Sequence, residues 1–147
     1  MKARDLMTPD PAQVTPTDTL QRVSQLMAEH DCGLIPVVQG ADQRSLVGVV
    51  TDRDIAIRAV AEGRPATTPI GEIMTPNPDC VGPDDDLEQV EKLMADRQIR
   101  RVVVVDGRGD CVGIIAQADL ARATKRLNDP SPKEMADVLE KISRPEL

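Results

Sequence analysis

The stretch Gly-Val-Val-Thr-Asp-Arg-Asp, residues 48–54, decides the fold of this chain. Apolar residues run through a glycine into a polar turn, and residues 55–60 continue as a helical pattern, which predicts a short strand leading into a helix. The N–H groups at a helix start suit a phosphate, which Thr51 and Arg53 could also contact. Asp54 could accept hydrogen bonds from two ribose hydroxyls. Thr51 and Asp54 equally fit a capping box, and both interpretations stay open here.

The same sequence pattern occurs a second time. Residues 111–120 repeat residues 46–55 at an offset of 65, and residues 72–78 repeat residues 5–11 at an offset of 67. One loop shortened by two residues explains the difference between the offsets. The chain therefore contains two copies of one supersecondary unit, and this repeat determines the expected architecture.

The composition limits the class of protein. The chain has 147 residues, of which 40% are apolar, and it contains no Phe, Tyr or Trp. Its core is therefore aliphatic, and any bound base must lie between aliphatic side chains. The net charge of −7 argues against a general nucleic-acid binder. No apolar run approaches the length of a membrane span, so we expect neither nucleic acid nor membrane as a partner.

The cysteines suggest the compartment. Cys32, Cys80 and Cys111 have no spacing typical of a disulfide framework or a metal site. We expect them to be small apolar fillers in a reducing, cytoplasmic setting, and no charged-then-apolar leader opens the chain. The sequence contains no visible nucleophile–base pair, metal cluster or P-loop. It therefore predicts no enzyme, no metal and no required cofactor.

The sequence predicts the element order strand, helix, strand, strand, helix for each copy of the unit. Pro36 in the second strand lacks an N–H group, so we expect the backbone there to be an open edge. The predicted strands of the two copies are residues 13–15, 34–38 and 46–50, then 80–81, 99–105 and 112–115. The predicted domain boundaries are residues 1–63 for the first repeat, 64–69 for a linker, 70–126 for the second repeat and 127–147 for a C-terminal extension.

The C-terminal extension carries a helix of its own. Ser131, Pro132 and Glu134 agree on a helix start, as cap, first residue and third residue. The helix then presents an amphipathic stripe made of Met135, Val138, Leu139 and Ile142. We expect this stripe to be buried either on the domain itself or on a partner chain, where it could extend a dimer interface.

Each unit opens with Met-Thr-Pro and ends with a glycine, a threonine and an aspartate at its last helix, and this pattern closely resembles the CBS domain. Two copies in tandem resemble the paired CBS (Bateman) module, over roughly residues 3–125, and the chain is similar to small stand-alone paired-CBS proteins. The resemblance implies an α/β (α+β) fold: two β-α-β-β-α repeats related by pseudo-twofold symmetry, plus the C-terminal helix.

The resemblance also implies a ligand. In this family the repeats pack sheet to sheet and form two clefts, in which many members bind AMP, ADP, ATP, S-adenosylmethionine or NAD. Asp54 would then hold the ribose, while Thr51 and Arg53 meet phosphate and aliphatic residues surround the base. The ligand-binding positions implied are Val14, Thr15, Gly33, Leu34, Ile35, Pro36, Thr51, Arg53 and Asp54 in the first repeat, and Val81, Arg100, Arg101, Val102, Ala116 and Asp119 in the second.

The second repeat departs from the pattern. Ala116 replaces the threonine and Ala118 the arginine, whereas Asp119 is kept. An aspartate that served only a reciprocal capping box would have lost its partner in Ala116, so the comparison favours a ribose role, although this helix could still be capped in another way. Arg100 and Arg101 are either a solvated strand end or positive charge near the central cleft. We therefore predict two unequal sites, with the Asp54 site the better formed.

Two functions from different classes follow. The first is a regulatory sensor that binds an adenosine-containing ligand and signals to an unknown partner protein through a change of conformation or dimer geometry. The second is a ligand-free module that acts through dimerisation and protein contacts alone. The family resemblance implies a homodimer in both cases.

Overall fold

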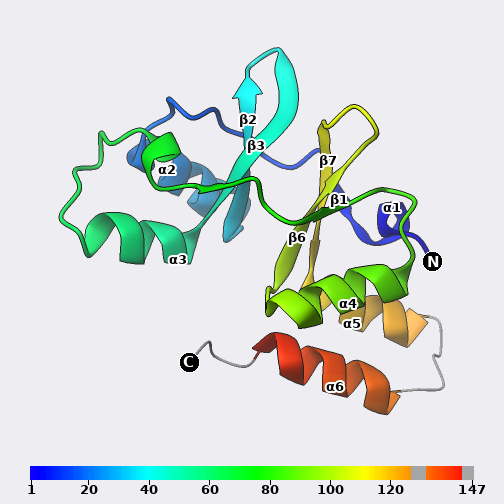
Figure 1. Cartoon of the computed structure of the whole chain (residues 1–147). Helices are drawn as coiled ribbons and strands as arrows, with labels where there is room; N and C mark the ends of the chain where they lie inside the picture. The colour runs from blue at the N-terminus through cyan, green and yellow to red at the C-terminus, as the bar shows by residue number, and fades with distance from the viewer. Residues whose placement is uncertain (127–131, 144–147) are drawn as a thin grey trace. The chain divides into compact units, whose positions relative to one another are not determined.

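A computed structural model describes residues 1–126 and 132–143 of the chain (Figure 1). The chain divides into two compact units, each of mixed α/β structure. Unit 1 consists of Met1–Pro9, Asp79–Asp106 and Val112–Leu147, and unit 2 of Asp10–Pro78 and Gly107–Cys111. The predicted α/β fold with two repeats and a C-terminal helix is confirmed.

Unit 2 contains an antiparallel sheet in the order β2 (Leu34–Gly40), β3 (Gln43–Thr51) and β4 (Thr75–Pro76). Val14 lies along the outer side of β2 as a parallel bridge. Its N–H group donates to the carbonyl of Pro36 at 3.1 Å, and its own carbonyl accepts from Val38 at 2.8 Å. The predicted open backbone at Pro36 is therefore wrong, because the chain around Val14 already pairs there.

The helical part of unit 2 comprises α2 (Leu20–His30), α3 (Asp52–Asp54), η1 (Ile55–Val60) and η2 (Ile70–Glu72). The single regular helix predicted after Thr51 is wrong in one respect. It begins as three α-helical residues and continues as a π-helix, in which the Ala61 N–H group reaches the carbonyl of Ala56 at 2.9 Å. The core of this unit is aliphatic, as the composition predicts: Val14, Leu20, Val23, Met27, Ile35, Val37, Val50, Ala59, Ile70 and Ile73.

Unit 1 contains the sheet β1 (Thr8–Pro9), β7 (Cys111–Ala116), β6 (Arg101–Val105) and β5 (Cys80–Val81), in that order. β5 runs parallel to β6, and β1 pairs antiparallel with β7. Strands β5, β6 and β7 fall where the second repeat predicted them. The core of the unit consists of Ala3, Leu6, Val81, Val90, Met94, Val102, Val104, Ile115, Leu120, Ala123 and Ile142.

The front segment of each copy lies in the unit of the other copy. Residues 1–9 open the first repeat but complete the sheet of unit 1, and β4 lies near the start of the second repeat but completes the sheet of unit 2. Two glycines allow this close pairing. A Cβ on Gly48 would lie 2.7 Å from the Sδ of Met74, and a Cβ on Gly113 would collide with Met7. The repeated glycine and the repeated Met-Thr-Pro are thus two sides of one contact.

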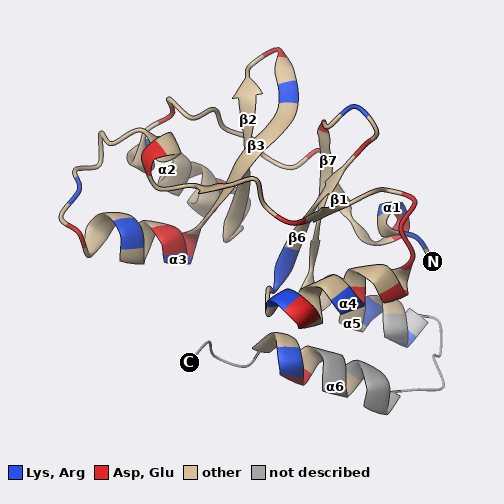
Figure 2. Ribbon diagram, viewed as in Figure 1, with Lys and Arg blue, Asp and Glu red and all other residues tan. Residues whose placement is uncertain are grey.

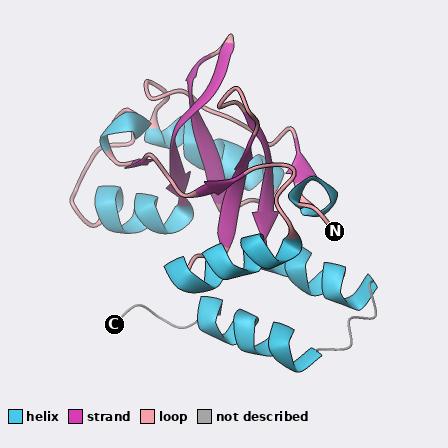
Figure 3. Cartoon of the chain, turned by 45° about the vertical axis from the view of Figure 1, so that its right-hand side comes forward, coloured by secondary structure: helices cyan, strands magenta, loops and turns pink. Residues whose placement is uncertain are grey.

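The helices of unit 1 are α1 (Ala3–Leu6), α4 (Leu87–Arg97), α5 (Gln117–Arg126) and α6 (Pro132–Ser143). Helix α6 packs against α4 and α5 of the same unit (Figure 3). Ile142 is 1% exposed, and the Gln117 Nε2 donates to the Ser143 Oγ at 2.8 Å. Of the described part of the predicted stripe, Ile142 is therefore buried within the chain and Leu139 is half-buried. Ser131 and the side chains of Met135 and Val138 lie outside the described residues.

Charged residues gather on the helices and loops of each unit (Figure 2). Strand β6 begins with a charged segment at Arg101, while β2 carries no charge. The cysteines divide into three cases: Cys111 is buried, Cys32 half-buried and Cys80 exposed, so the prediction of apolar fillers is wrong for Cys80. No helix in the described part of the chain is long and apolar enough to span a bilayer.

Candidate functional site

The capping box at the start of α3 is formed. The Thr51 Oγ1 accepts a hydrogen bond from the Asp54 N–H group at 3.0 Å, and the Asp54 Oδ2 accepts one from the Thr51 N–H group at 3.0 Å. Of the two interpretations left open by the sequence, capping is therefore realised. Capping occupies only part of the carboxylate, because an ionised carboxylate has about four lone-pair sites.

Asp119 holds the equivalent place at the start of α5. Its Oδ2 accepts a hydrogen bond from the Ala116 N–H group at 2.7 Å. The carboxylate half of the box thus needs only a backbone donor and survives the loss of the threonine hydroxyl. The exchange for Ala116 therefore removes only the hydroxyl half of the reciprocal box, and the comparison of the repeats does not by itself favour ribose binding.

The second oxygen of each carboxylate faces an arginine one helical turn later. The Asp54 Oδ1 lies 3.7 Å from the Nε of Arg58, and the Asp119 Oδ1 pairs with the Nη2 of Arg122. The two aspartates are largely shielded, with side chains 16% and 10% exposed, whereas the two arginines are 50% and 67% exposed. Arg122 is therefore the exposed member of its pair, and Asp119 the shielded one.

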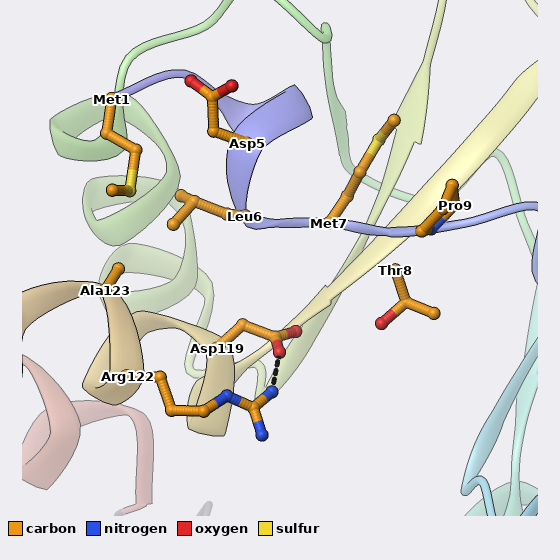
Figure 4. Close-up of a pocket in the computed structure, with 9 residues that line it drawn as sticks. All are labelled: Met1, Asp5, Leu6, Met7, Thr8, Pro9, Asp119, Arg122 and Ala123. Atoms are coloured by element: carbon orange, nitrogen blue, oxygen red, sulfur yellow. Dashed lines mark hydrogen bonds and ion pairs between the residues drawn. The ribbon is translucent and has the colours of Figure 1, made fainter. Parts of the chain in front are cut away.

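A pocket of about 410 Å³ lies beside Asp119 in unit 1 (Figure 4). It is open between the N-terminal segment and helix α5, and its volume falls within the range of roughly 300–1,000 Å³ typical of small-molecule sites. The residues that line it are Met1, Asp5, Leu6, Met7, Thr8, Pro9, Asp119, Arg122 and Ala123.

The pocket has an apolar part and a polar part. Leu6, Met7 and Ala123 supply aliphatic surface, whereas the polar groups of Asp119, Arg122 and Thr8 lie together at another side of the hollow (Figure 4). This combination suits a flat apolar ring that carries a polar, hydroxylated extension. The remaining charged side chain, Asp5, already accepts a hydrogen bond from the Lys2 N–H group at 3.0 Å.

Of the predicted site residues, only Asp119 lines this pocket. Several others belong to the interior of their own unit. Thr15 binds locally, since its N–H group donates to the Asp18 Oδ2 at 2.8 Å. Two of the predicted positions are exposed, Arg53 and Arg100, and four are half-buried: Gly33, Thr51, Arg101 and Ala116. The buried predicted positions are Val14, Leu34, Ile35, Pro36, Val81 and Val102.

The pocket residues that the sequence missed come mainly from the first nine residues. A signal for them was present, because Met7-Thr8-Pro9 recurs as Met74-Thr75-Pro76. The repeat identified this segment as part of the family's sequence pattern. It did not indicate that the segment and a helix more than a hundred residues later line the same pocket.

The described residues, 1–126 and 132–143, contain no group of three His, Cys, Asp or Glu placed to hold a metal ion. Partial burial of the thiol, together with the carboxylates of Asp79 and Asp85, raises the pKa of Cys80. A thiol of this kind stays protonated at neutral pH, which makes it a poor nucleophile and a poor metal ligand.

Comparison with known proteins gives consistent matches. The CBS domain model matches residues 3–60 and 70–126. The CBS domain-containing protein YhcV of Bacillus subtilis is 41% identical over 140 residues, which cover 95% of this chain and 94% of YhcV. Protein PAE2072 from Pyrobaculum aerophilum, complexed with AMP, is 28% identical with a TM-score of 0.79, covering 93% of this chain and 99% of that one.

A further solved structure carries a different adenosine derivative. The CBS domain pair of protein MJ0100, in complex with 5′-methylthioadenosine and S-adenosyl-L-methionine, is 27% identical with a TM-score of 0.76. The match covers 84% of this chain and 98% of that one. Related chains of this length and fold thus hold adenosine compounds with and without a phosphate.

Proposed function

We propose, because this chain belongs to the CBS domain family, that it is a regulatory module that binds an adenosine-containing ligand in the pocket beside Asp119. One observation carries the proposal: a hollow of about 410 Å³ opens next to a shielded carboxylate that keeps free acceptor capacity. The complexes of PAE2072 with AMP and of MJ0100 with S-adenosyl-L-methionine support the choice of ligand class.

The ligand would use both parts of the pocket. The ribose hydroxyls would donate to Asp119, whose Oδ2 keeps its bond from Ala116. The purine would lie on the aliphatic surface of Leu6 and Met7, which fits a chain without aromatic residues. A phosphate, where the ligand has one, would draw Arg122 away from its pair with Asp119.

The charges of the pocket limit the class of ligand. Arg122 is the one cationic side chain among the nine lining residues, against the carboxylates of Asp5 and Asp119. A triphosphate would bring several negative charges next to those carboxylates, which repel it. We therefore expect AMP or S-adenosylmethionine to bind more tightly than ADP or ATP.

Binding can act as a signal only if two conformations differ in ligand affinity. The ligand would join the segment of residues 1–9 to helix α5, which the sequence separates by more than a hundred residues. We propose that this junction is the responsive element, that the chain acts as a homodimer, and that an unidentified protein responds to the change. Light scattering with and without AMP measures the dimer directly.

The proposal is not enzymatic. The lining residues include no Cys, His, Ser or Lys. Thr8 supplies the one hydroxyl side chain of the lining, and Asp119 binds the Ala116 N–H group and Arg122 rather than that hydroxyl. The proposed role is therefore ligand-dependent regulation rather than turnover.

The test is calorimetric titration of the purified protein with AMP, ATP, NAD and S-adenosylmethionine, together with a thermal melt in each ligand. A ligand that binds only the folded protein at 100 times its Kd stabilises it by about 2.7 kcal/mol. Because the chain has no aromatic residues, a nucleotide retained through purification dominates its near-ultraviolet spectrum. Absence of heat, of thermal shift and of retained nucleotide for all four ligands would leave the ligand-free interaction module as the function.

A further inference from the structure

The two units differ at one position that bears on how many ligands each chain holds. At the offset of 65 residues that relates the ends of the repeats, Ala123 corresponds to Arg58, just as Asp119 corresponds to Asp54. At the offset of 67 that relates their front segments, the pocket residues Leu6 and Thr8 correspond to Ile73 and Thr75. The walls of the unit 1 pocket therefore have counterparts in unit 2, with two large exchanges: Arg58 stands where unit 1 has Ala123, and Ile57 where it has Arg122.

The guanidinium of Arg58 lies among these counterparts. Its Nη1 donates to the carbonyl of Ile73 at 3.3 Å and to the Oγ1 of Thr75 at 3.3 Å, while its Nε lies 3.7 Å from the Asp54 Oδ1. The side chain thus reaches from the helix that carries Asp54 to the two residues that correspond to the opposite wall of the unit 1 pocket.

In unit 1, the same position leaves space. Ala123 is 3% exposed, belongs to the core, and contributes only a methyl group to the lining of the pocket (Figure 4). The arginine of unit 1, Arg122, stands one residue earlier, is 67% exposed and contacts Asp119. The residue corresponding to Arg122 in unit 2 is Ile57, which is 48% exposed.

We infer that Arg58 closes the site of unit 2, so that each chain binds one ligand, in unit 1. The inference rests on the proposed function, since it assigns the pocket beside Asp119 to that ligand. Arg58 acts by occupancy: its Nη1 donates to the Ile73 carbonyl and the Thr75 hydroxyl, and its Nε forms a longer ion pair with Asp54. These are the groups that a ligand would otherwise meet. This reverses the ranking of the two sites predicted from the sequence, in which the Asp54 site was the better formed.

The experiment is calorimetric titration of AMP into the full chain, read as ligands bound per chain. The wild-type protein should bind one AMP, and Arg58→Ala should bind two. Arg58→Met keeps the aliphatic stem and removes the donors, and this second variant should also bind two AMP. Arg64→Ala is the matched control, because Arg64 is a partly exposed arginine of unit 2 paired with Glu72 at 3.3 Å and should leave one AMP per chain. Circular dichroism establishes that each variant is folded.

The reciprocal variant Ala123→Arg places the large side chain in unit 1 and should abolish binding; combined with Arg58→Ala, it should move the single AMP to unit 2. Two ligands bound to the wild type, or one ligand bound to both Arg58 variants, would overturn the closing role while the proposed function stands. A protein that binds no AMP in any variant would overturn the proposed function itself, and this inference with it.

Discussion

Asp119→Asn separates the capping role of this side chain from its proposed role in holding a ribose. The amide keeps an oxygen that can accept the Ala116 N–H bond, which is 2.7 Å long in the native protein. It loses the negative charge and the pair with Arg122, an arginine 67% exposed. The exposed arginine keeps the value of the pair within the roughly 0–1 kcal/mol of surface pairs, and the negative charge at the start of α5 adds about 0.3–1 kcal/mol, so we expect the free energy of unfolding to fall by about 1–2 kcal/mol.

The effect on AMP binding should be larger. A hydrogen bond to a charged acceptor contributes roughly 1.5–3 kcal/mol, and the neutral amide of the variant would have no charged oxygen to offer the ribose hydroxyls. The loss of one such bond corresponds to a Kd about 10- to 100-fold higher. Calorimetric titration with AMP measures the affinity, and urea unfolding followed by circular dichroism measures the stability, since the chain lacks tryptophan and tyrosine for fluorescence.

Asp54→Asn is the matched control. Its carboxylate makes the same backbone bond, from Thr51 at 3.0 Å, and also faces an arginine. With the unit 2 site closed by Arg58, this variant should bind AMP as the wild type does. Wild-type affinity in Asp119→Asn, or a weakened affinity in Asp54→Asn alone, would refute the assignment of the ribose to Asp119.

Three further predictions concern single positions. Ile142→Ala should lower the free energy of unfolding by about 2–4 kcal/mol, because it leaves a cavity where α6 packs on its unit. The control Lys141→Ala, at an exposed position of the same helix, should change it by less than about 0.5 kcal/mol. Equal losses of the two variants in urea unfolding would contradict the packing of α6. Thr51→Ala should cost about 1 kcal/mol through the lost cap and leave AMP affinity unchanged. The raised pKa of Cys80 keeps its thiolate scarce at mildly alkaline pH. Asp79→Asn removes one cause of that shift and should therefore speed the alkylation of Cys80, which mass spectrometry follows. An unchanged rate would contradict the electrostatic cause.

The repeat made most of the fold predictable from the sequence. The positions of β6 and β7 follow from apolar runs between turn residues, and α4 repeats the apolar spacing of α2. These features are local, and periodicity records them directly. The π-helical turn after Asp54 leaves no comparable mark, because the same apolar residues suit an α-helix equally well.

The candidate site was less predictable, for two physical reasons. The pairing of Thr8-Pro9 with β7 joins segments about a hundred residues apart, and a two-residue strand carries too little pattern to indicate its partner. The pocket then follows from that pairing, since its walls are residues 1–9 and helix α5. The capping bond from Ala116 was also hidden, because a backbone N–H group is present at every residue except proline.

The exchange of front segments has a practical consequence for handling the protein. Trimming the chain before residue 10 would leave the first repeat's own sheet intact, yet strip an edge strand from the sheet of the distant second repeat and remove most of the binding wall. An affinity tag fused ahead of Met1 would be attached to a residue that itself lines that hollow. Ligand screens should therefore use material from which any such tag has been cleaved.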